Sequence, residues 1–444
     1  MSKIIGIDLG TTYSCIAVWH NNAPQVIPNE NGQRTTASCV SFVDSKIIVG
    51  DKDDPHAIHN VKRFMGQKTL FNNYTPEKIS SCILSELKKC AENYLLEPVT
   101  KAIITVPAYF NDAQRQATVR AGKDANLEIV QLINEPTAAA MAYGLDKSDK
   151  TVLIYDLGGG TLDVSLLTIK DGVFQVKGTS GHAKLGGIDF DTLLADYCAT
   201  KVDISTEDNI LLQCEEAKKQ LSILDKTTIY LINGVITITR VQFEKIIEPL
   251  VKKCMSPIHD VLSLTGIRKN DIDEIVLIGG STRIPIIRTS LETFFRKKIC
   301  TDINPDEAVA IGASIFANTL INKTDMVLID VTSMSIGVEV FGGKMEVIIP
   351  RSTTIPVKKD KIFTSHSDNV KTLTIKIYEG EKQFTKDNNF LSTIEMKGLT
   401  MAKRGVLQIK VTFSIDVSNV LTITCVDVTK GGASNLITHT LKYM

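Results

Sequence analysis

Two stretches of the chain, residues 4–12 and 153–163, place acids, glycines and hydroxyl side chains in the same order. In each stretch a short apolar strand ends in an acid, Asp8 or Asp156, and continues into a glycine turn. Glycine lets backbone N–H groups approach phosphate oxygens closely because no Cβ intervenes, and the acid can hold Mg²⁺ through water. A single glycine turn after a strand is more often a structural feature of the backbone than a phosphate-binding site. Two copies predict a nucleoside triphosphate that is clamped from both sides of a cleft.

The elements that must position these loops alternate between strand and helix patterns up to about Leu320. An apolar run at 102–106 precedes a helical pattern at 112–125, and an alanine-rich helix is expected from 134 to 143. This alternation indicates α/β layers. Farther along the chain the pattern has a period of two, and strands are expected at 406–417 and 420–428, around Ser418-Asn419. Such a pattern indicates a β-sandwich or a related pair of sheets.

Composition narrows the class of protein. A chain of 444 residues is too long for one core, so two or three domains are expected. The formal net charge of zero gives no general attraction to nucleic acid or to an anionic membrane, so neither is expected as a partner. The odd count of nine cysteines, without a CxxC pair, argues against a disulfide framework and a zinc site, and it is typical of a cytoplasmic protein.

Two further observations concern targeting and thiol chemistry. No apolar run reaches the length of a bilayer span, and the chain enters a strand directly, so neither an anchor nor a leader is expected. Cys15 follows the first glycine turn. A packing role is favoured for it over a redox-sensitive one.

Eight motifs along the chain resemble those of the 70-kDa heat-shock (DnaK-type) chaperones. They are IIGIDLGTTYSC at 4–15, TVPAYFNDAQRQAT at 105–118, INEPTAAA at 133–140, DLGGGTLDVS at 156–165, IGGSTRIP at 278–285, INPDEAVAIGA at 303–313, YEGE at 378–381 and TKDNN at 385–389. The resemblance implies an α/β, actin-like two-lobed ATPase domain at 1–322, a hydrophobic linker at 323–331 and a β-sandwich peptide-binding domain at 332–444. Because the chain ends with the sheet domain, no helical lid is expected.

The resemblance also implies ATP or ADP and Mg²⁺ as cofactors and assigns roles around the phosphates. Lys62 would reach the γ-phosphate and the attacking water, Glu135 would help to orient that water, and Thr161, also in the catalytic set, would bind the phosphates from the second turn. Asp8 and Asp156 would hold the metal through water. Positioning and charge neutralisation are what phosphoryl transfer mainly needs. The phosphate loops themselves would comprise Gly10, Thr11, Thr12, Tyr13, Gly158, Gly159 and Gly160.

The implied adenosine pocket is formed by one face of a helix and by a third glycine turn at 279–280. Arg283 would lay its guanidinium plane on the purine. The family usually has another arginine where this chain has Lys219, and because lysine lacks a planar head, one side of the stack should be weaker. The spacing of three and four residues places Glu215, Lys218 and Ser222 on one face of this helix. The remaining pocket residues would be Glu215, Lys218, Ser222, Gly279, Gly280, Ser281 and Asp306.

The resemblance further implies coupling between the two domains and a set of partners. Pro107 and Arg115 would relay the nucleotide state, and the linker residues that take part would be Val327, Leu328, Ile329 and Asp330. J-domain co-chaperones are implied as partners, although Gln131 stands where the family places an arginine that helps to engage them. Short segments at 65–74, 191–214 and 232–234 argue against the usual exchange factors.

The implied peptide cleft would hold an extended segment of an unfolded protein by backbone hydrogen bonds and apolar pockets. Phe341 and His366 would arch over the peptide, and the other cleft residues would be Val338, Val340, Phe363, Leu373 and Ile375. Without the resemblance, sandwich core is the favoured interpretation of these residues. The leading hypothesis is therefore an ATP-dependent chaperone, with a non-cycling nucleotide-binding holdase or regulator of other chaperones as the alternative and a sugar kinase as a third class that the β-domain motifs disfavour.

Overall fold

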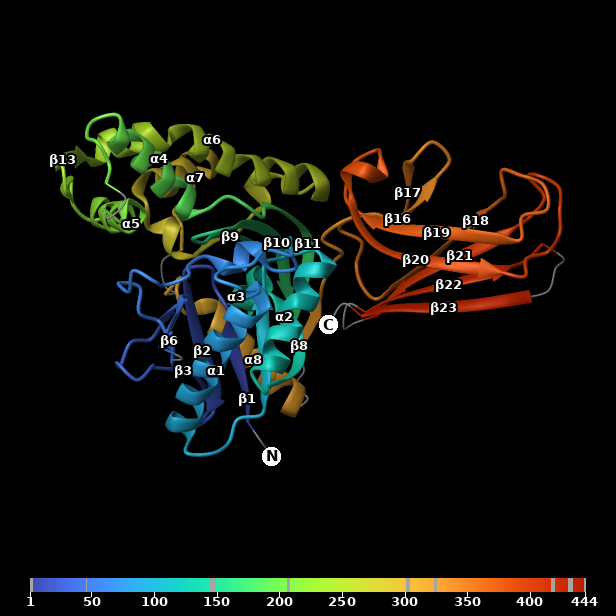
Figure 1. Ribbon diagram of the computed structural model, residues 1–444, viewed down its shortest axis with the longest axis horizontal. Helices are drawn as coiled ribbons and strands as arrows, with labels where there is room; N and C mark the ends of the chain where they lie inside the picture. Colours follow the sequence, from blue (N-terminus) through green and yellow to red (C-terminus); the bar gives the residue numbers. More distant parts are fainter. Residues whose placement is uncertain are drawn as a thin grey trace. The chain divides into compact units, whose positions relative to one another are not determined.

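The computed structural model describes residues 3–44, 46–143, 149–205, 208–300, 304–322, 326–416, 420–429 and 434–442 (Figure 1). The chain divides into two compact units. The first comprises residues 1–109 and 118–328, and the second comprises residues 110–117 and 329–444. The predicted turn at Ser418-Asn419 lies outside the described residues.

The first sheet of the first unit has the order β3-β2-β1-β7-β8, with the short strand β4 beside β2. Strand β1 pairs antiparallel with β2 and parallel with β7, and β8 continues the parallel part. Because β1 is buried along almost its whole length, its run of isoleucines reads as a central strand. The bounds are β1 (Ile4–Asp8), β2 (Tyr13–His20), β3 (Ala23–Ile27), β4 (Thr36–Ala37), β7 (Lys101–Val106) and β8 (Glu128–Asn134), with the hairpin β5 (Val40–Val43) and β6 (Lys46–Val49) and the 3₁₀ turn η1 (Val61–Phe64) alongside.

The second sheet repeats this plan. Its order is β14-β9-β10-β11-β15, and β9 pairs antiparallel with β10 and parallel with β14, as β1 does with β2 and β7. The two glycine turns thus follow equivalent central strands, β1 and β9. The bounds are β9 (Lys150–Leu157), β10 (Leu162–Lys170), β11 (Val173–His182), β14 (Glu274–Ile278) and β15 (Val327–Ile329).

Two helices connect the sheets at their centre. Helix α8 packs on β1, β2 and β7, α3 packs on β9 and β10, and the two helices pack against each other. Their approach is close because both helices contain several alanines and α8 has a glycine at the contact: a Cβ on Gly312 would collide with the backbone carbonyl of Ala138. The predicted helices at 112–125 and 134–143 are confirmed within a residue. The bounds are α1 (Pro76–Leu95), α2 (Asp112–Asp124), α3 (Glu135–Tyr143) and α8 (Ala308–Asn322).

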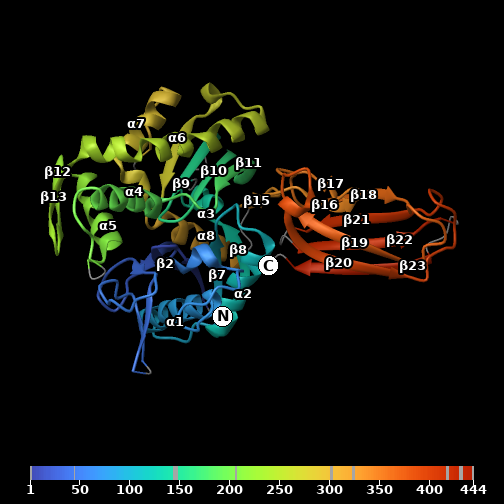
Figure 2. The same ribbon diagram turned by 45° about the horizontal axis from the view of Figure 1, so that its top comes forward.

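The rest of the first unit covers the second sheet. One apolar core is formed by side chains of β9 and β10 together with the buried faces of α4, α5, α6 and α7. The hairpin β12–β13 lies next to α5 (Figure 2). No helix that the structure describes is long and apolar enough to cross a membrane. The bounds are α4 (Gly187–Ala199), α5 (Ile210–Leu221), β12 (Lys226–Leu231), β13 (Gly234–Thr239), α6 (Arg240–Thr265), η3 (Lys269–Asp271), η4 (Gly280–Arg283) and α7 (Pro285–Phe295).

The second unit contains two four-stranded sheets, with orders β17-β16-β19-β20 and β18-β21-β22-β23. The alternating residues of both sheets enclose one apolar core. The predicted strand at 406–417 starts later, at Ile409, because Gly405 has a φ of +81° and Val406 closes a turn onto Lys403. The bounds are β16 (Ile336–Val340), β17 (Lys344–Ile349), β18 (Val357–Phe363), β19 (Thr372–Glu379), η5 (Thr385–Asp387), β20 (Asn389–Lys397), β21 (Ile409–Ile415), β22 (Val420–Asp427) and β23 (Ser434–Lys442).

Candidate functional site

A cavity of about 770 Å³ in the first unit is lined from both sheets. The two glycine turns meet at it. A Cβ on Gly159 would collide with the Thr12 hydroxyl, and a Cβ on Gly160 would lie 2.7 Å from the Thr11 side chain. Both turns therefore present bare backbone and hydroxyl groups to the same space, which is the arrangement that suits an anion such as a polyphosphate.

Lys62, one of the lysines that line this cavity, lies among several carboxylates. Lys62, from η1, places its Nζ 2.5 Å from Oε1 of Glu135, the first residue of α3, and both side chains are buried. Burial lowers the pKa of Lys62, but the carboxylates of Glu135 and Asp8 outweigh it and raise the pKa overall. A lysine in this setting stays charged and is held in one place.

The strand-end acids carry raised pKa values. Burial, followed by repulsion from Glu135, raises the pKa of Asp8 to about 7, while Lys62 and a hydrogen bond from Thr105 oppose the shift. Burial, again followed by Glu135, raises the pKa of Asp156 well above its usual range. One lysine does not balance three neighbouring carboxylates, so the site has a deficit of positive charge.

A divalent cation fits this deficit, and Asp8 and Asp156 are the residues that would hold it. Among the described residues, no group of three or more His, Cys, Asp or Glu side chains is arranged to ligate one metal directly. Oxygen ligands from two acids, water and phosphate match the chemistry of Mg²⁺, which keeps several waters. The residues present therefore fit Mg²⁺ bound together with a phosphate ligand.

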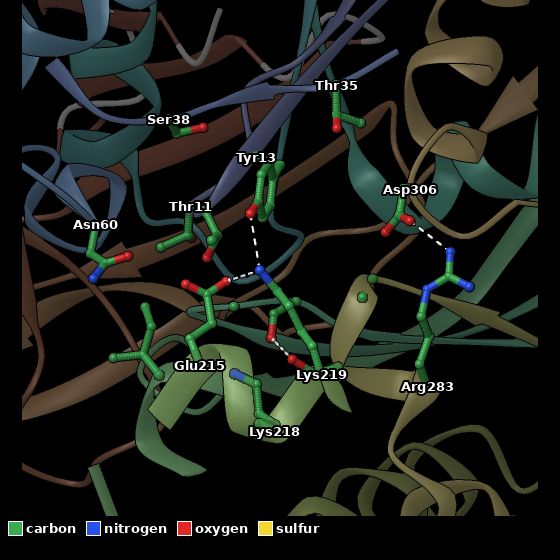
Figure 3. A pocket seen from close by; sticks show the side chains of 18 of the residues that line it. Thr11, Tyr13, Thr35, Ser38, Asn60, Glu215, Lys218, Lys219, Arg283 and Asp306 are labelled. Atoms are coloured by element: carbon green, nitrogen blue, oxygen red, sulfur yellow. Dashed lines mark hydrogen bonds and ion pairs between the residues drawn. The ribbon is translucent and has the colours of Figure 1, made fainter. Parts of the chain in front are cut away.

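Helix α5 supplies the other wall of the cavity (Figure 3). The Lys219 ammonium lies 2.6 Å from Glu215 Oε1, donates to the Tyr13 hydroxyl at 3.0 Å and lies 5.1 Å from the Tyr13 ring centre. Burial lowers the pKa of Lys219, but its hydrogen bonds to Glu215 and Tyr13 dominate and raise it. Lys219 therefore joins α5 to a residue of the first glycine turn. The Ser222 hydroxyl donates to the Lys218 carbonyl at the end of the helix.

The turn after β14 completes the cavity. Arg283 pairs with Asp306 at 2.6 Å, and both residues line the cavity (Figure 3). Gly279 has a φ of +79°, and a Cβ there would collide with the Leu157 carbonyl, so the turn requires glycine. Ser281 donates to the Gly158 carbonyl at 2.9 Å and thereby fixes the second glycine turn. The cavity thus brings together the predicted phosphate and adenosine residues apart from Gly160, which does not line it, since Gly10, Thr161, Gly280 and Ser222 also belong to the lining.

Sequence reasoning missed a second charged pair at the glycine turns. Arg63 pairs with Asp189 at 2.5 Å and donates to the Gly160 carbonyl at 3.1 Å. The Asp189 side chain also accepts from the Gly186 N–H at 2.7 Å. These contacts tie η1 and the start of α4 to the second turn. The only signal in the sequence is a second cation directly after Lys62.

The motif at 156–165 contains a further acid, Asp163, to which the sequence assigned no role. Asp163 is fully buried, accepts from the Tyr109 N–H at 3.2 Å and helps to raise the pKa of Asp156. It lies opposite Asp156 in the β9–β10 ladder. Its place two residues after the last hydroxyl of the turn is the signal that could have marked it.

The predicted coupling residues lie outside the cavity lining. In the first unit, Pro107 is buried after β7, and the Val327 N–H donates to the Gly172 carbonyl at 3.1 Å, so the segment 327–328 extends the second sheet beside β11. Gln131 is a half-buried residue of β8. In the second unit, Arg115 is buried and donates to the Phe110 carbonyl, and the Asp330 carbonyl accepts from the Ile355 N–H at 3.0 Å, next to Ile329.

The predicted peptide residues differ in exposure. Val338 and Ile375 belong to the buried core of the second unit. Val340, Phe363 and Leu373 pack at its margin and are half-buried. Phe341 is 89% exposed and its ring centre lies 6.5 Å from that of the exposed His366. Phe341 and His366 therefore form an aromatic pair on the surface of the second unit.

One comparison with known proteins bears on the whole chain. The family model described as Hsp70 protein matches residues 4–71 and 62–442.

Proposed function

The chain belongs to the Hsp70 family of ATP-binding chaperones, and from this premise we propose that Mg-ATP in the cavity controls binding and release of extended apolar segments of unfolded proteins. The observation that carries the proposal is the direct apposition of Gly159 and Gly160 to Thr12 and Thr11, next to the buried Lys62. Members of this family are ATPases. We propose the same activity here.

Each residue near the glycine turns has a part in the proposed hydrolysis. The backbone N–H groups and hydroxyls of the turns bind the phosphates. Lys62 stays protonated and stabilises the charge that develops on the γ-phosphate, and Glu135 holds both Lys62 and the attacking water. When bound, Mg²⁺ supplies charge neutralisation of the phosphate oxygens. Asp8 and Asp156 are the residues that would hold its waters.

The purine end of the cavity would be formed by α5 and η4. Arg283, held by Asp306, offers its guanidinium plane to the base. Lys219 is engaged with Tyr13 and Glu215. We propose that this bridge substitutes for the second stacking arginine by holding the first turn against α5.

The domain roles follow from the same proposal. Residues 1–322 would form the two-lobed nucleotide-binding domain, 323–331 the linker and 332–444 the β-sandwich that binds substrate. The edge position of β15 beside β11 supports a linker that can attach to the sheet. The exposed pair Phe341 and His366 supports an arch over a bound peptide. A change in linker attachment with nucleotide state would couple the two domains.

The test is steady-state ATP hydrolysis with and without an unfolded apolar polypeptide. Stimulation of hydrolysis by the polypeptide, together with faster polypeptide release on ATP addition, is expected. Tight ATP binding without stimulation or release would contradict the coupled cycle. It would favour the non-cycling holdase or regulator, which is motivated by the glutamine at position 131 and by the short segments at 65–74, 191–214 and 232–234.

A further inference from the structure

A buried threonine of the first sheet contacts one of the two strand-end acids. Thr105 is the fifth residue of β7, in which the other buried residues are apolar, and it is fully buried itself. Burial of a hydroxyl is unfavourable unless the hydroxyl has a hydrogen-bond partner. The partner here is a carboxylate, since the Thr105 hydroxyl donates to Asp8 Oδ1 at 3.3 Å. The hydroxyl of Thr105 is thus directed at an acid of the proposed site.

The register of the first sheet produces this contact. Strands β1 and β7 are parallel, and the last pair in their register is Ile7 with Ile104. Asp8 and Thr105 are the next residues along the two strands, so the backbone places the hydroxyl beside the carboxylate. Because both side chains are short, the contact belongs to the sheet and does not depend on a loop.

The second sheet has no such donor at the equivalent position. Strands β9 and β14 are also parallel, and Asp156 lies beside Ile278 in their register. The side chain of isoleucine cannot form a hydrogen bond. An apolar residue therefore satisfies the packing of this position in one sheet, whereas the other sheet carries a hydroxyl there. The difference indicates that Thr105 has a role in the first sheet that packing does not supply.

The surroundings of Asp8 indicate what that role is. The Lys62 ammonium lies 2.5 Å from Glu135, so the neighbouring cation is already bound to another carboxylate. A carboxylate has two oxygens that accept hydrogen bonds. When Thr105 holds Oδ1 of Asp8, rotation of the carboxylate is restricted, and Oδ2 is the oxygen that would accept from a metal-bound water.

We propose that Thr105 is a positioning residue that holds the Asp8 carboxylate in the orientation in which it accepts from the waters of Mg²⁺. This inference rests on the proposed function, in which Asp8 and Asp156 hold the metal through water. Partners that hydrogen-bond to the residues around a metal fix their orientation, and loss of such a partner typically lowers metal affinity about 10–100-fold. Thr105 is not part of the cavity lining, so it acts on the metal through Asp8.

The experiment separates the hydroxyl of Thr105 from its volume. Thr105→Val keeps the shape and removes the donor, whereas Thr105→Ser keeps the donor and removes a methyl group. Binding of a fluorescent ATP analogue to the full chain is followed while Mg²⁺ is added to a metal-free sample, so metal affinity is read without hydrolysis. The half-saturating Mg²⁺ concentration is expected to rise about tenfold in Thr105→Val, at the lower end of the range because Asp8 acts through water, and to stay within about threefold of wild type in Thr105→Ser. Binding of the analogue without Mg²⁺ should be the same in all three proteins.

Thr179→Val is the matched control. Thr179 is buried on β11, its hydroxyl is hydrogen-bonded to the Ser165 hydroxyl at 3.0 Å, and neither residue lines the cavity. This variant also loses a buried hydroxyl, and it is expected to keep the wild-type Mg²⁺ dependence. If Thr105→Val does not fold, Thr105→Ala is compared with Thr105→Ser, because these two differ only by the hydroxyl. The alanine variant alone is then expected to need more Mg²⁺.

Three results would decide against the inference, and one against its premise. An unchanged Mg²⁺ dependence in Thr105→Val would show that Asp8 does not need the hydroxyl. An equal or larger shift in Thr105→Ser would assign Thr105 to packing. Weaker binding of the analogue without Mg²⁺ in Thr105→Val would mean that Thr105 acts on the first glycine turn and not on the metal. A wild type that binds no ATP, or binds it equally with and without Mg²⁺, would instead contradict the proposed function.

Discussion

Replacement of Lys62 by methionine tests the centre of the proposed site. Methionine keeps most of the length of the side chain and removes its charge. The Lys62 ammonium lies 2.5 Å from Glu135, and its pKa responds to Asp8 and Asp156 as well. The substitution therefore removes the positive charge next to the position where the γ-phosphate would react. It leaves the glycine turns intact.

The expected effects differ for rate and for binding. Loss of one preorganised donor to a developing charge lowers the rate by about 10²–10³-fold. ATP affinity should change by less than about tenfold, because the turns and α5 still hold the ligand. Removing one partner of a buried ion pair costs about 3–5 kcal/mol of stability.

Single-turnover hydrolysis of bound ATP, equilibrium ATP binding and urea unfolding separate these effects. Lys68→Met is the matched control, since Lys68 is exposed in the turn after η1. Glu135→Gln and the double variant complete a cycle, in which the stability effects should not add because the two side chains are in contact. Hydrolysis within about threefold of wild type in Lys62→Met, with ATP bound, would refute the assigned role.

Four further substitutions address three other parts of the molecule. Lys219→Met and Tyr13→Phe should each speed nucleotide release about three- to tenfold, and the double variant should be no faster, when release is followed with a fluorescent ATP analogue by stopped flow. Gly186→Ala should weaken ATP binding about tenfold or more in calorimetry, because the new Cβ would lie 2.6 Å from the backbone of Gly159. Phe341→Ala should change the unfolding free energy by less than about 0.5 kcal/mol, since the side chain is 89% exposed, yet lower the affinity for a fluorescent apolar peptide in anisotropy titrations. Additive release rates, unchanged ATP binding or unchanged peptide affinity, respectively, would contradict these expectations.

The elements that the sequence predicts best are those with local causes. The glycine turns were identified because the acid, the glycines and the hydroxyls are neighbours in the chain, and the helix from Glu135 was identified from its alanine run. The strand start at Ile409 was missed because the left-handed turn at Gly405 competes with the apolar pattern around Val406. Local propensity does not decide which of these two signals wins.

The contacts that organise the cavity are not local. Lys219 reaches Tyr13 over a separation of 206 residues, and Arg63 reaches Asp189 over 126. No spacing rule connects such residues, because the fold alone determines which helix ends face which turns. The residue types and their order indicated the two glycine turns and their acids, and the family resemblance indicated the other members of the site. Neither indicated that a lysine in place of an arginine would bridge to the first turn.

The two glycine turns differ in the number of acids beside them, and the difference comes from the residue that lies opposite each strand-end acid. Asp8 lies opposite Cys15 in the β1–β2 ladder, whereas Asp156 lies opposite Asp163 in the equivalent β9–β10 ladder. Cys15 is fully buried, its thiol donates to the Arg34 carbonyl, and burial raises its pKa, so it remains neutral and suits packing rather than redox chemistry. The first turn therefore carries one acid and the second carries two. Because a neighbouring negative charge raises the pKa of an acid, Asp163 adds to the raised pKa of Asp156, and Asp156 is the residue of the second turn that would hold a bound cation through water.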